Sequence, residues 1–492
     1  MPTVRSYVVS LLGAVAALAF LAGCGGSDTG STTDSAAMAP KDAGLYLSVD
    51  TNREGDQWQS LEALVERIPG GREGFDRLLA ELTEDSGVDF EDDLLPALGD
   101  EVVVVLPGGS ANPVALAQPD DEEKLKELAE RSDADVVFRD VEGWTAIAES
   151  GPALDAYERA LERGRLADES AFSETMADLP ADTLVRAYVR GEGLEGVLGR
   201  AQAGALGSLG PLGSLAQGGT PSAATLGTIA LGVAAEKEGL RVEGSVRQES
   251  VPASFSPRLL PKVPDGAFIV VTGKGGPALS EQLRKAIGGN DEVLRQFEQL
   301  SGVSLDDLLE LFEGEVVFYA RSGLPIPELT LVVEATGSQL ETIDALFQRL
   351  AAQSNTQITS TVEGGVPVKV LSVAGGLSVR YAKTGGLVVV TTSPAGIRAL
   401  TSGGAKLVDD EAFKAAADDV GYDGSTSGLV YVDVDAVAPL LQGVLGLVGG
   451  GTPGAAAGLD QLARALESLD SIAANVSTEG DGARFEAFVR VR

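Results

Sequence analysis

The chain has 492 residues, of which 44% are hydrophobic and 22% charged, a composition typical of a folded protein and not of a disordered one. Its 73 acidic and 37 basic residues give a formal net charge of -36, which argues against nucleic acid as a partner because phosphate binding needs clustered cations. With no histidine and one cysteine in the sequence, histidine-dependent catalysis and disulfide frameworks are excluded, and we expect no enzyme, cofactor or metal site.

The chain begins with the pattern of a lipoprotein signal peptide, predicted over residues 1–23. Arg5 supplies a positive charge, and residues 7–20 form an apolar run shorter than the roughly 20 residues of a membrane-spanning helix. The run ends in Leu21, Ala22, Gly23 and Cys24. This ending resembles a bacterial lipobox, which implies cleavage before Cys24 and attachment of diacylglycerol to its thiol.

Residues 24–41 are predicted to be a flexible tether, since they are rich in Gly, Ser, Thr, Ala and Asp and lack hydrophobic periodicity. A flexible coil of this length reaches about 20–25 Å on average. Two acyl chains anchor a protein stably, whereas one binds a membrane only marginally. We therefore expect an extracytoplasmic protein that is held at the bacterial cell membrane by its N-terminal acyl chains.

Two parts of the remaining chain share sequence patterns in the same order. SGVDFEDDLLPALGDEVVVVL (86–106) matches SGVSLDDLLELFEGEVVFYA (301–320), and LADESAF (166–172) matches LVDDEAF (407–413). IALGVAAEKEGLRVEGSVR (229–247) pairs with IAANVSTEGDGARFEAFVR (472–490). These matches predict a tandem duplication. The predicted parts are repeat 1 over 42–250, a proline-rich linker over 251–262, and repeat 2 over 263–492.

Within repeat 1 the pattern predicts strands and helices that interleave. The elements expected in chain order are a helix around 61–68, strands 101–106 and 114–118, a helix 122–132, a hairpin 136–149 turning at Glu142 and Gly143, helices from 152 and 170, a strand 184–190, and a hairpin 229–247. From 114–118 to 184–190 this is the β-α-β-β-α-β order of ferredoxin-like folds. Repeat 2 shows the same order with an extra hairpin. We expect an α+β fold of two similar repeats with mainly antiparallel sheets, each a ferredoxin-like core plus a C-terminal hairpin.

A family resemblance rests on the lipobox, the acidic tether and two apolar stretches. The stretches are APKDAGLYLSVDTNREGDQWQSLEALVERIPGG and LLPKVPDGAFIVV. Together these features resemble a bacterial envelope family known as domain of unknown function 3352. The resemblance covers nearly the whole mature chain and implies an extracytoplasmic protein of unassigned activity. It transfers no functional residues.

Three motifs suggest chemistry, and each has a simpler structural interpretation. GEGLEG (191–196) fits a dinucleotide-binding pattern, but Glu192 and Glu195 would face the pyrophosphate, so a loop entering a helix is preferred. Residues 50–55 begin like a calcium loop but have Leu61 where a bidentate Glu is needed. The acidic pairs at 92–93, 306–307 and 409–410 could serve hydrolysis, but each precedes an apolar helical stretch, where helix capping is favoured.

Two matched segments without any charged residue are the strongest candidates for function. They are 201–235 and 436–459, at the same place in the two repeats. One interpretation is a loosely packed helix and loop that cover their own sheet. The other is a movable apolar flap over a groove for an acyl chain. The residues predicted to line such a flap are Leu198, Leu206, Leu209, Leu212, Leu445 and Leu447.

The sequence therefore favours a non-catalytic, membrane-anchored lipoprotein that binds an apolar or lipid-like ligand or an envelope protein partner. The alternative is a carboxylate-dependent hydrolase of envelope glycan or lipid. That enzyme needs two acids facing each other across an open cleft, about 5–10 Å apart.

Overall fold

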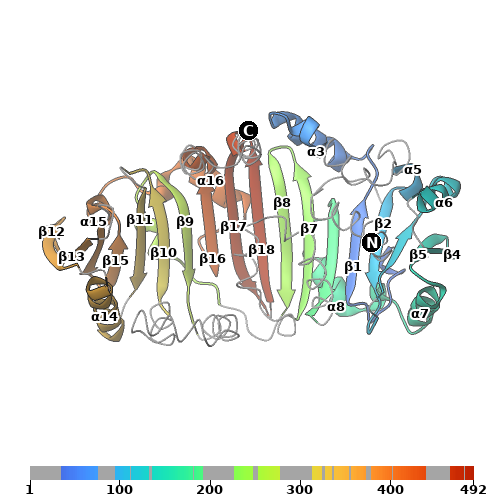
Figure 1. The fold of residues 1–492 in the computed structure, drawn as a ribbon, viewed down its shortest axis with the longest axis horizontal. Helices are drawn as coiled ribbons and strands as arrows, with labels where there is room; N and C mark the ends of the chain where they lie inside the picture. Colours follow the sequence, from blue (N-terminus) through green and yellow to red (C-terminus); the bar gives the residue numbers. More distant parts are fainter. Residues whose placement is uncertain are drawn as a thin grey trace. The chain divides into compact units, whose positions relative to one another are not determined.

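A computed structural model of the chain describes residues 35–75, 95–110, 112–131, 136–180, 182–191, 227–247, 253–276, 313–323, 327–334, 337–353, 356–372, 378–401, 403–438, 466–480 and 482–492. The described chain forms an α+β fold with antiparallel strand pairing, which confirms the α+β class and the antiparallel pairing expected from the sequence. It divides into two compact units: the described residues up to 247 with Val491 and Arg492 form one, and the described residues from 253 to Arg490 form the other. Figure 1 labels the elements of both. No helix among these residues has the length and apolar character needed to cross a membrane.

The first unit, called unit 1, contains one antiparallel sheet. Its strands are β1 (Leu45–Asp50), β2 (Glu101–Leu106), β3 (Val114–Ala117), β4 (Val137–Val141), β5 (Trp144–Ala148), β6 (Val185–Arg190), β7 (Thr228–Glu236) and β8 (Gly239–Arg247). Its helices are α3 (Asp56–Arg67), α5 (Leu95–Leu98), α6 (Glu122–Arg131), α7 (Gly151–Glu162) and α8 (Ser170–Met176), with the 3-10 turn η2 (Leu166–Asp168). The strand pairings give the order β4-β5-β3-β2-β1-β6-β7-β8.

The second unit, called unit 2, also contains an antiparallel sheet. Its strands are β9 (Ala267–Lys274), β10 (Glu315–Arg321), β11 (Glu328–Glu334), β12 (Ile358–Glu363), β13 (Val366–Ser372), β14 (Ser378–Thr384), β15 (Leu387–Thr391), β16 (Gly428–Asp433), β17 (Leu469–Glu479) and β18 (Gly482–Val491). Its helices are α14 (Gly337–Gln353), α15 (Pro394–Thr401) and α16 (Glu411–Asp419), with the 3-10 turns η5 (Leu260–Lys262) and η7 (Leu407–Asp409). The pairings give the order β12-β13-β14-β15-β11-β10-β9-β16-β17.

The predicted ferredoxin-like core is not confirmed by these pairings. In such a core the fourth strand of the β-α-β-β-α-β order lies beside the first. Here the first of the four, β3, pairs with β2 and β5, so both of its edges are occupied. The fourth, β6, pairs with β1 instead. The two strands that precede the predicted core, β1 and β2, are therefore inserted into it.

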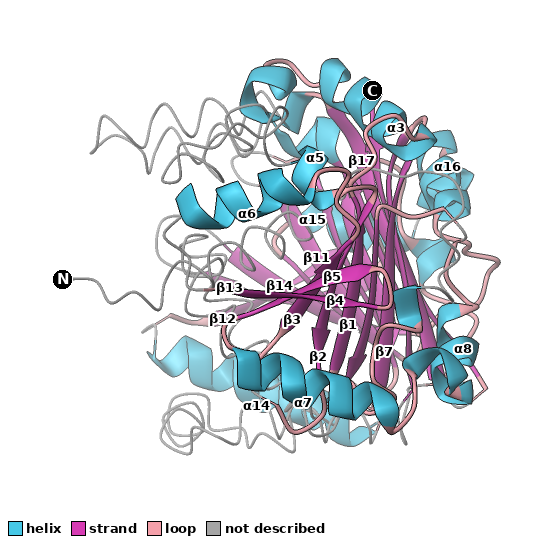
Figure 2. Cartoon of the chain, turned by 90° about the vertical axis from the view of Figure 1, so that its right-hand side faces the viewer, coloured by secondary structure: helices cyan, strands magenta, loops and turns pink. Residues whose placement is uncertain are grey.

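The core of unit 1 lies on one face of its sheet. Tyr46, Val103, Leu116 and Tyr188 point to this face and are buried beneath α7 and α8. The ring of Phe172 in α8 packs edge-on against Tyr46 and Tyr188, with ring centroids 5.7 and 5.0 Å away. Figure 2, in which unit 1 faces the viewer, shows the strands as a layer with helices outside it. The aromatic cluster thus joins the helical layer to the strands.

The predicted tether is too long at its C-terminal end. Ala36 and Ala39 are fully buried in the core of unit 1. The hydroxyls of Ser35 and Tyr46 share a hydrogen bond of 2.8 Å, and the Tyr157 hydroxyl donates to the Met38 carbonyl at 2.6 Å. Small apolar residues without periodicity gave no sign of this burial, because the partners that bury them come from distant parts of the chain. Residues from Ser35 onward belong to the folded body.

The segment expected to be a linker is likewise part of a core. Leu259 and Leu260 are buried among the core residues of unit 2. The buried Glu315 carboxylate accepts hydrogen bonds from the backbone N–H groups of Arg258 and Leu259, at 2.9 and 2.6 Å. The prolines of this stretch suggested a connection, but its paired leucines supply apolar surface that packs into unit 2.

Candidate functional site

The residues proposed as sites from the sequence lie outside the part of the chain that the structure describes. They are Leu21, Ala22, Gly23 and Cys24 of the predicted lipobox, and the predicted flap residues Leu198, Leu206, Leu209, Leu212, Leu445 and Leu447. Among the described residues, the candidate site lies on the strands of unit 2.

Two of the polar motifs have structural roles. The Asp50 carboxylate accepts a hydrogen bond from the Asn52 N–H at 2.8 Å, and the Asn52 side chain accepts one from the Glu54 N–H at 2.9 Å. Residues 50–54, which begin like a calcium loop, therefore form a turn held by side-chain to backbone hydrogen bonds. The Asp410 side chain accepts from the N–H groups of Ala412 and Phe413, so the predicted cap of α16 is confirmed. Within the described ranges, no group of His, Cys, Asp and Glu is arranged to hold a metal ion.

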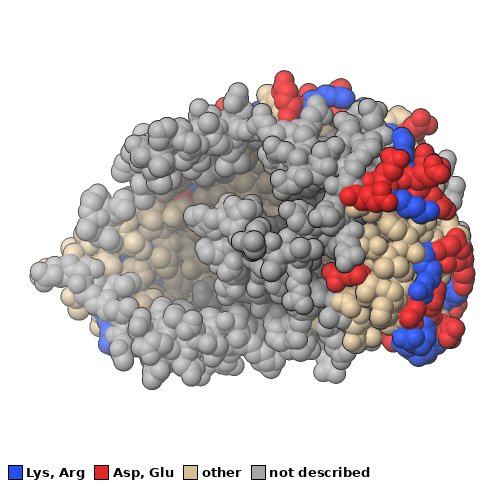
Figure 3. Space-filling view, turned by 45° about the vertical axis from the view of Figure 1, so that its right-hand side comes forward, with Lys and Arg blue, Asp and Glu red and all other residues tan. Residues whose placement is uncertain are grey.

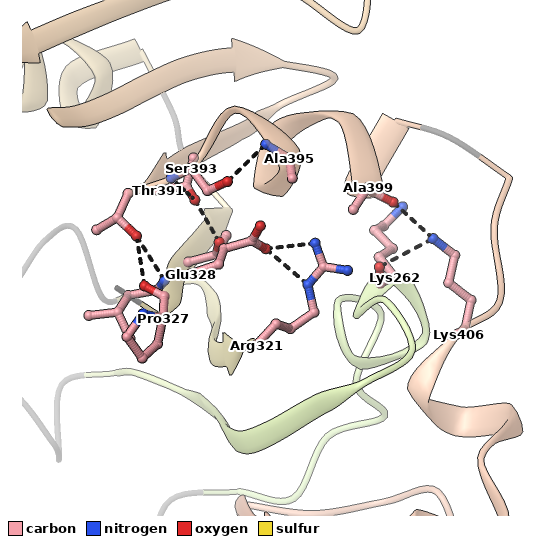
Figure 4. Close-up of polar contacts among 12 residues, drawn as sticks. Lys262, Arg321, Pro327, Glu328, Thr391, Ser393, Ala395, Ala399 and Lys406 are labelled. Atoms are coloured by element: carbon pink, nitrogen blue, oxygen red, sulfur yellow. Dashed lines mark hydrogen bonds and ion pairs between the residues drawn. The ribbon is translucent and has the colours of Figure 1, made fainter. Parts of the chain in front are cut away.

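The buried carboxylates of unit 2 are held by partners of opposite charge or by N–H donors. Glu328 is buried and accepts hydrogen bonds from Arg321 at 3.0 and 2.8 Å (Figure 4). Beside it, the hydroxyls of Thr330 and Thr391 lie 2.8 Å apart. Glu315 is held by the backbone amides already described. These contacts give both buried carboxylates hydrogen-bond partners, which a buried polar group needs to be tolerated in the core of a sheet.

Burial also removes several tyrosines from acid–base chemistry. It raises the pKa of the Tyr46 and Tyr319 hydroxyls far above the ordinary value. The same cause raises the pKa of Tyr157 and Tyr431. These four hydroxyls are therefore neutral at physiological pH and act as hydrogen-bonding or packing groups.

The unusual surface of unit 2 is the sheet face opposite its helix-covered core. Side chains alternate between the two faces of a strand. On β9, Val270 and Thr272 are buried while Val271 between them is 42% exposed. On β11, Leu329 is 41% exposed between the buried Glu328 and Thr330. An antiparallel sheet with a solvated face usually carries polar residues there, so these exposed aliphatic side chains need an explanation.

The same face is apolar on the neighbouring strands. We define the open aliphatic face as the half-buried or exposed residues Ile269, Val271, Val316, Phe318, Leu329, Leu331, Val430 and Val432. Phe318 is the cross-strand partner of both Val271 and Leu331, and Val430 is the partner of Val271. Partners of this kind lie about 4.5–5.5 Å apart. They form a continuous apolar row across β16, β9, β10 and β11, and within these described strands the face carries no charged side chain.

Helix α14 covers the neighbouring part of the sheet. Ile343, Phe347 and Ala351 of α14 are buried against Leu371, Tyr381 and Val388, which belong to β13, β14 and β15. The Phe347 and Tyr381 rings lie 4.2 Å apart between centroids. The open aliphatic face, on β16, β9, β10 and β11, therefore lies next to the part of the sheet that α14 covers.

A compact charge cluster fixes α14 to the sheet. The Asp344 carboxylate binds Lys369 at 2.6 Å and Lys383 at 2.7 Å, and it accepts a hydrogen bond from the Tyr381 hydroxyl. Burial acts to raise the pKa of the Asp344 carboxyl, but hydrogen bonds and charge from the two lysines outweigh it and lower the pKa below its usual range. The cluster joins α14 to β13 and β14, and none of its residues belongs to the open aliphatic face.

Sequence reasoning missed this face, although a signal for it was present. The strands β9, β10 and β11 read AFIVVTGK, EVVFYAR and ELTLVVE, with apolar residues on both faces instead of strict alternation. Such runs are typical of strands buried on both sides. The pattern could have been taken as a prediction that the second face also binds something apolar.

Comparison with known families gives one match that spans most of the chain. The family described as "Protein of unknown function (DUF3352)" matches residues 4–133 and 153–491. The chain belongs to this family. The resemblance drawn from the sequence is thereby confirmed, and DUF3352 carries no assigned activity.

Other comparisons add little to the DUF3352 match. A search of curated proteins gave no significant match. Among solved structures, the one titled "Structure of crystal form I of TP0453" aligns with 51% of this chain and 85% of its own, at 9% sequence identity and a TM-score of 0.23. A similarity this weak does not bear on the fold or the function.

Proposed function

We propose that this DUF3352 chain is a non-catalytic, extracytoplasmic lipoprotein that binds a hydrocarbon chain on the open aliphatic face of unit 2. Lipidation at Cys24 would hold the protein at the bacterial cell membrane. The observation that carries the ligand proposal is the apolar row of Val271, Phe318 and Leu331, in which Val271 is 42% exposed in the middle of a sheet.

Covering this apolar row with a hydrocarbon chain would be favourable, because it removes apolar surface from water. Each Å² of apolar surface removed from water contributes roughly 25 cal/mol, so covering about 200 Å² contributes roughly 5 kcal/mol before the costs of association. Because the face lacks charged side chains, it offers no partner for a polar head group. The ligand that fits is an acyl chain whose head group stays in water.

We also infer that the two units arose by tandem duplication. Apart from β12 and β13, each strand of unit 2 up to β17 has a counterpart in unit 1 with the same pairing partners. A binding role for an envelope protein partner remains within this proposal. The hydrolase alternative finds no favouring observation among the described carboxylates, because the buried ones are held by cations or N–H groups.

Native mass spectrometry of residues 25–492, purified from a bacterial periplasm, tests the proposal directly. This range contains every residue that the structure describes. We expect a lipid bound in stoichiometric amount, identified in a parallel organic extract. Binding of a fluorescent fatty acid, cis-parinaric acid, provides the affinity.

Two matched substitutions test whether the fatty acid binds on the open aliphatic face. Val271→Lys introduces a charge into the centre of the open aliphatic face and should weaken fatty-acid binding at least about tenfold, since a tenfold loss needs only about 1.4 kcal/mol. Val137→Lys changes a comparably exposed valine on β4 of unit 1 and should leave binding unchanged. Circular dichroism confirms that both variants fold. A protein that is empty after purification and does not bind the probe would contradict the ligand proposal and leave the protein-partner role.

A further inference from the structure

A second surface of unit 2 is the free edge of its sheet at β12. Among the described strands β12 pairs only with β13, so no described strand pairs with its other side, and β12 lies at the left end of the strands in Figure 1. Thr359, Ser360 and Thr361 are exposed, and Val362 is 68% exposed. The pairing with β13 is regular over the whole strand. A regular edge strand that no described strand pairs with is a template for pairing with another strand.

The corresponding edge of unit 1 carries charged side chains that oppose pairing with another strand. Its edge strand β4 carries Arg139 and Asp140 in its middle. The Arg139 guanidinium binds Asp155 and Glu158 of α7, each at 2.8 Å. Charged side chains crowd this end of unit 1 (Figure 3). Charged residues on an edge strand prevent unwanted pairing, and β12 has neither a lysine nor a proline to do so.

The sequence of β12 is suited to pair with itself. In an antiparallel pair centred on Ser360, Ile358 of one copy faces Val362 of the other, on the same side of the sheet as Ser360. Thr359 faces Thr361 on the opposite side. Aliphatic pairs and threonine pairs are favourable cross-strand neighbours, and no like charges meet within this register.

The charge next to the strand is already neutralised. Glu363, at the end of β12, binds Arg380 at 3.2 Å. Lys369, which lies beside Ser360 on β13, binds Asp344. The edge is thus locally neutral in a protein whose formal net charge is -36.

We propose that β12 is a self-association edge, through which two copies of this chain pair antiparallel across a two-fold axis at Ser360. A two-fold contact of this kind uses the same surface on both copies and closes without forming filaments. The ladder is short, so the dimer is weak and forms at high protein concentration. Because the net charges repel, association becomes stronger as salt screens them.

Sedimentation velocity on residues 25–492 measures the dimer. We expect the association constant to rise at least about threefold between 50 and 500 mM NaCl, as screening removes repulsion. Thr361→Lys places two new like charges next to each other at the edge and should abolish association. Val137→Lys, at the edge of unit 1, is the matched control and should not change it.

Disulfide crosslinking tests the β12 pairing with a substitution at an exposed position, so the result does not depend on a variant that destabilises the fold. Residues 25–492 contain no cysteine. Directly opposed residues in an antiparallel pair have Cα atoms about 4.5–5.5 Å apart, within disulfide reach. Ser360→Cys should therefore form a covalent dimer under mild oxidation, whereas Asp140→Cys on β4 should not. A protein that stays monomeric at all salt concentrations, or a dimer unaffected by Thr361→Lys, would overturn the proposal.

Discussion

Units 1 and 2 share the pairing order of their central strands, but they differ in how exposed the side chains on one sheet face are. Leu47 on β1 and Val271 on β9 occupy the same place, each between the central strands of its unit. Leu47 is 9% exposed and Val271 is 42% exposed. The same aliphatic position is thus closed in one unit and open in the other. Where two units share a plan, the surface that differs is where a separate function is expected.

The shared plan includes the way each unit fixes its first strand. Pro40 forms an isolated bridge with Arg165 in unit 1, and Pro264 forms one with Lys406 in unit 2. The Leu166 N–H donates to the Ala39 carbonyl at 2.8 Å, and the Leu407 N–H donates to Val263 at 3.0 Å. This equivalence involves main-chain contacts between segments far apart in the chain, which makes a shared origin the simplest explanation.

The largest expected effect tests whether these two contacts are equivalent. Leu166 and Leu407 follow the bridges and are buried in the cores of their units. Leu166→Ala and Leu407→Ala should each lower the free energy of unfolding by about 3 kcal/mol, because a buried leucine leaves a cavity when truncated. Urea unfolding measures both. Losses that differ by more than about twofold would argue against a shared plan.

A smaller difference in stability is expected between the units at the helix that follows each bridge, which is α8 in unit 1 and α16 in unit 2. Asp410 caps α16 through two hydrogen bonds, whereas Glu169, at the N-cap of α8, makes no side-chain cap. Asp410→Ala should cost about 1 kcal/mol of stability, and Glu169→Ala should cost nothing measurable. Thermal unfolding provides the comparison. Equal losses would mean that the cap does not distinguish the two helices.

The smallest effect concerns the charge cluster that joins α14 to β13 and β14 of unit 2. The lysines keep the pKa of Asp344 below its unfolded value, so this group stabilises the fold above an ordinary aspartate pKa of about 3.9 and the contribution is lost as pH falls through the lowered folded pKa. Asp344→Asn should therefore reduce stability at pH 7 and have little effect in strong acid. Unfolding curves at several pH values between 7 and 2 test this. A difference that stays constant over this range would contradict the assigned role.

Local features of the fold were predictable because local sequence determines them. The α+β class, the Asp410 cap and the hairpin turn at Glu142 and Gly143, where both residues have positive φ, follow from short-range patterns. The position of β6 beside β1 did not follow, since strand order depends on long-range contacts. The open aliphatic face was missed because its apolar strands resemble strands buried on both sides.

The burial of Ser35, Ala36, Met38, Ala39 and Pro40 has a consequence for the order in which the protein folds. The Tyr157 hydroxyl and the Met38 carbonyl are 119 residues apart in sequence, and Arg165 reaches the Ala37 carbonyl across 128 residues. A chain delivered from its N-terminus exposes the early segment long before these partners arrive. Unit 1 therefore cannot complete its core until η2 has emerged, and closing so long a loop makes this step slow. The first residues of the folded body are among the last to reach their final contacts.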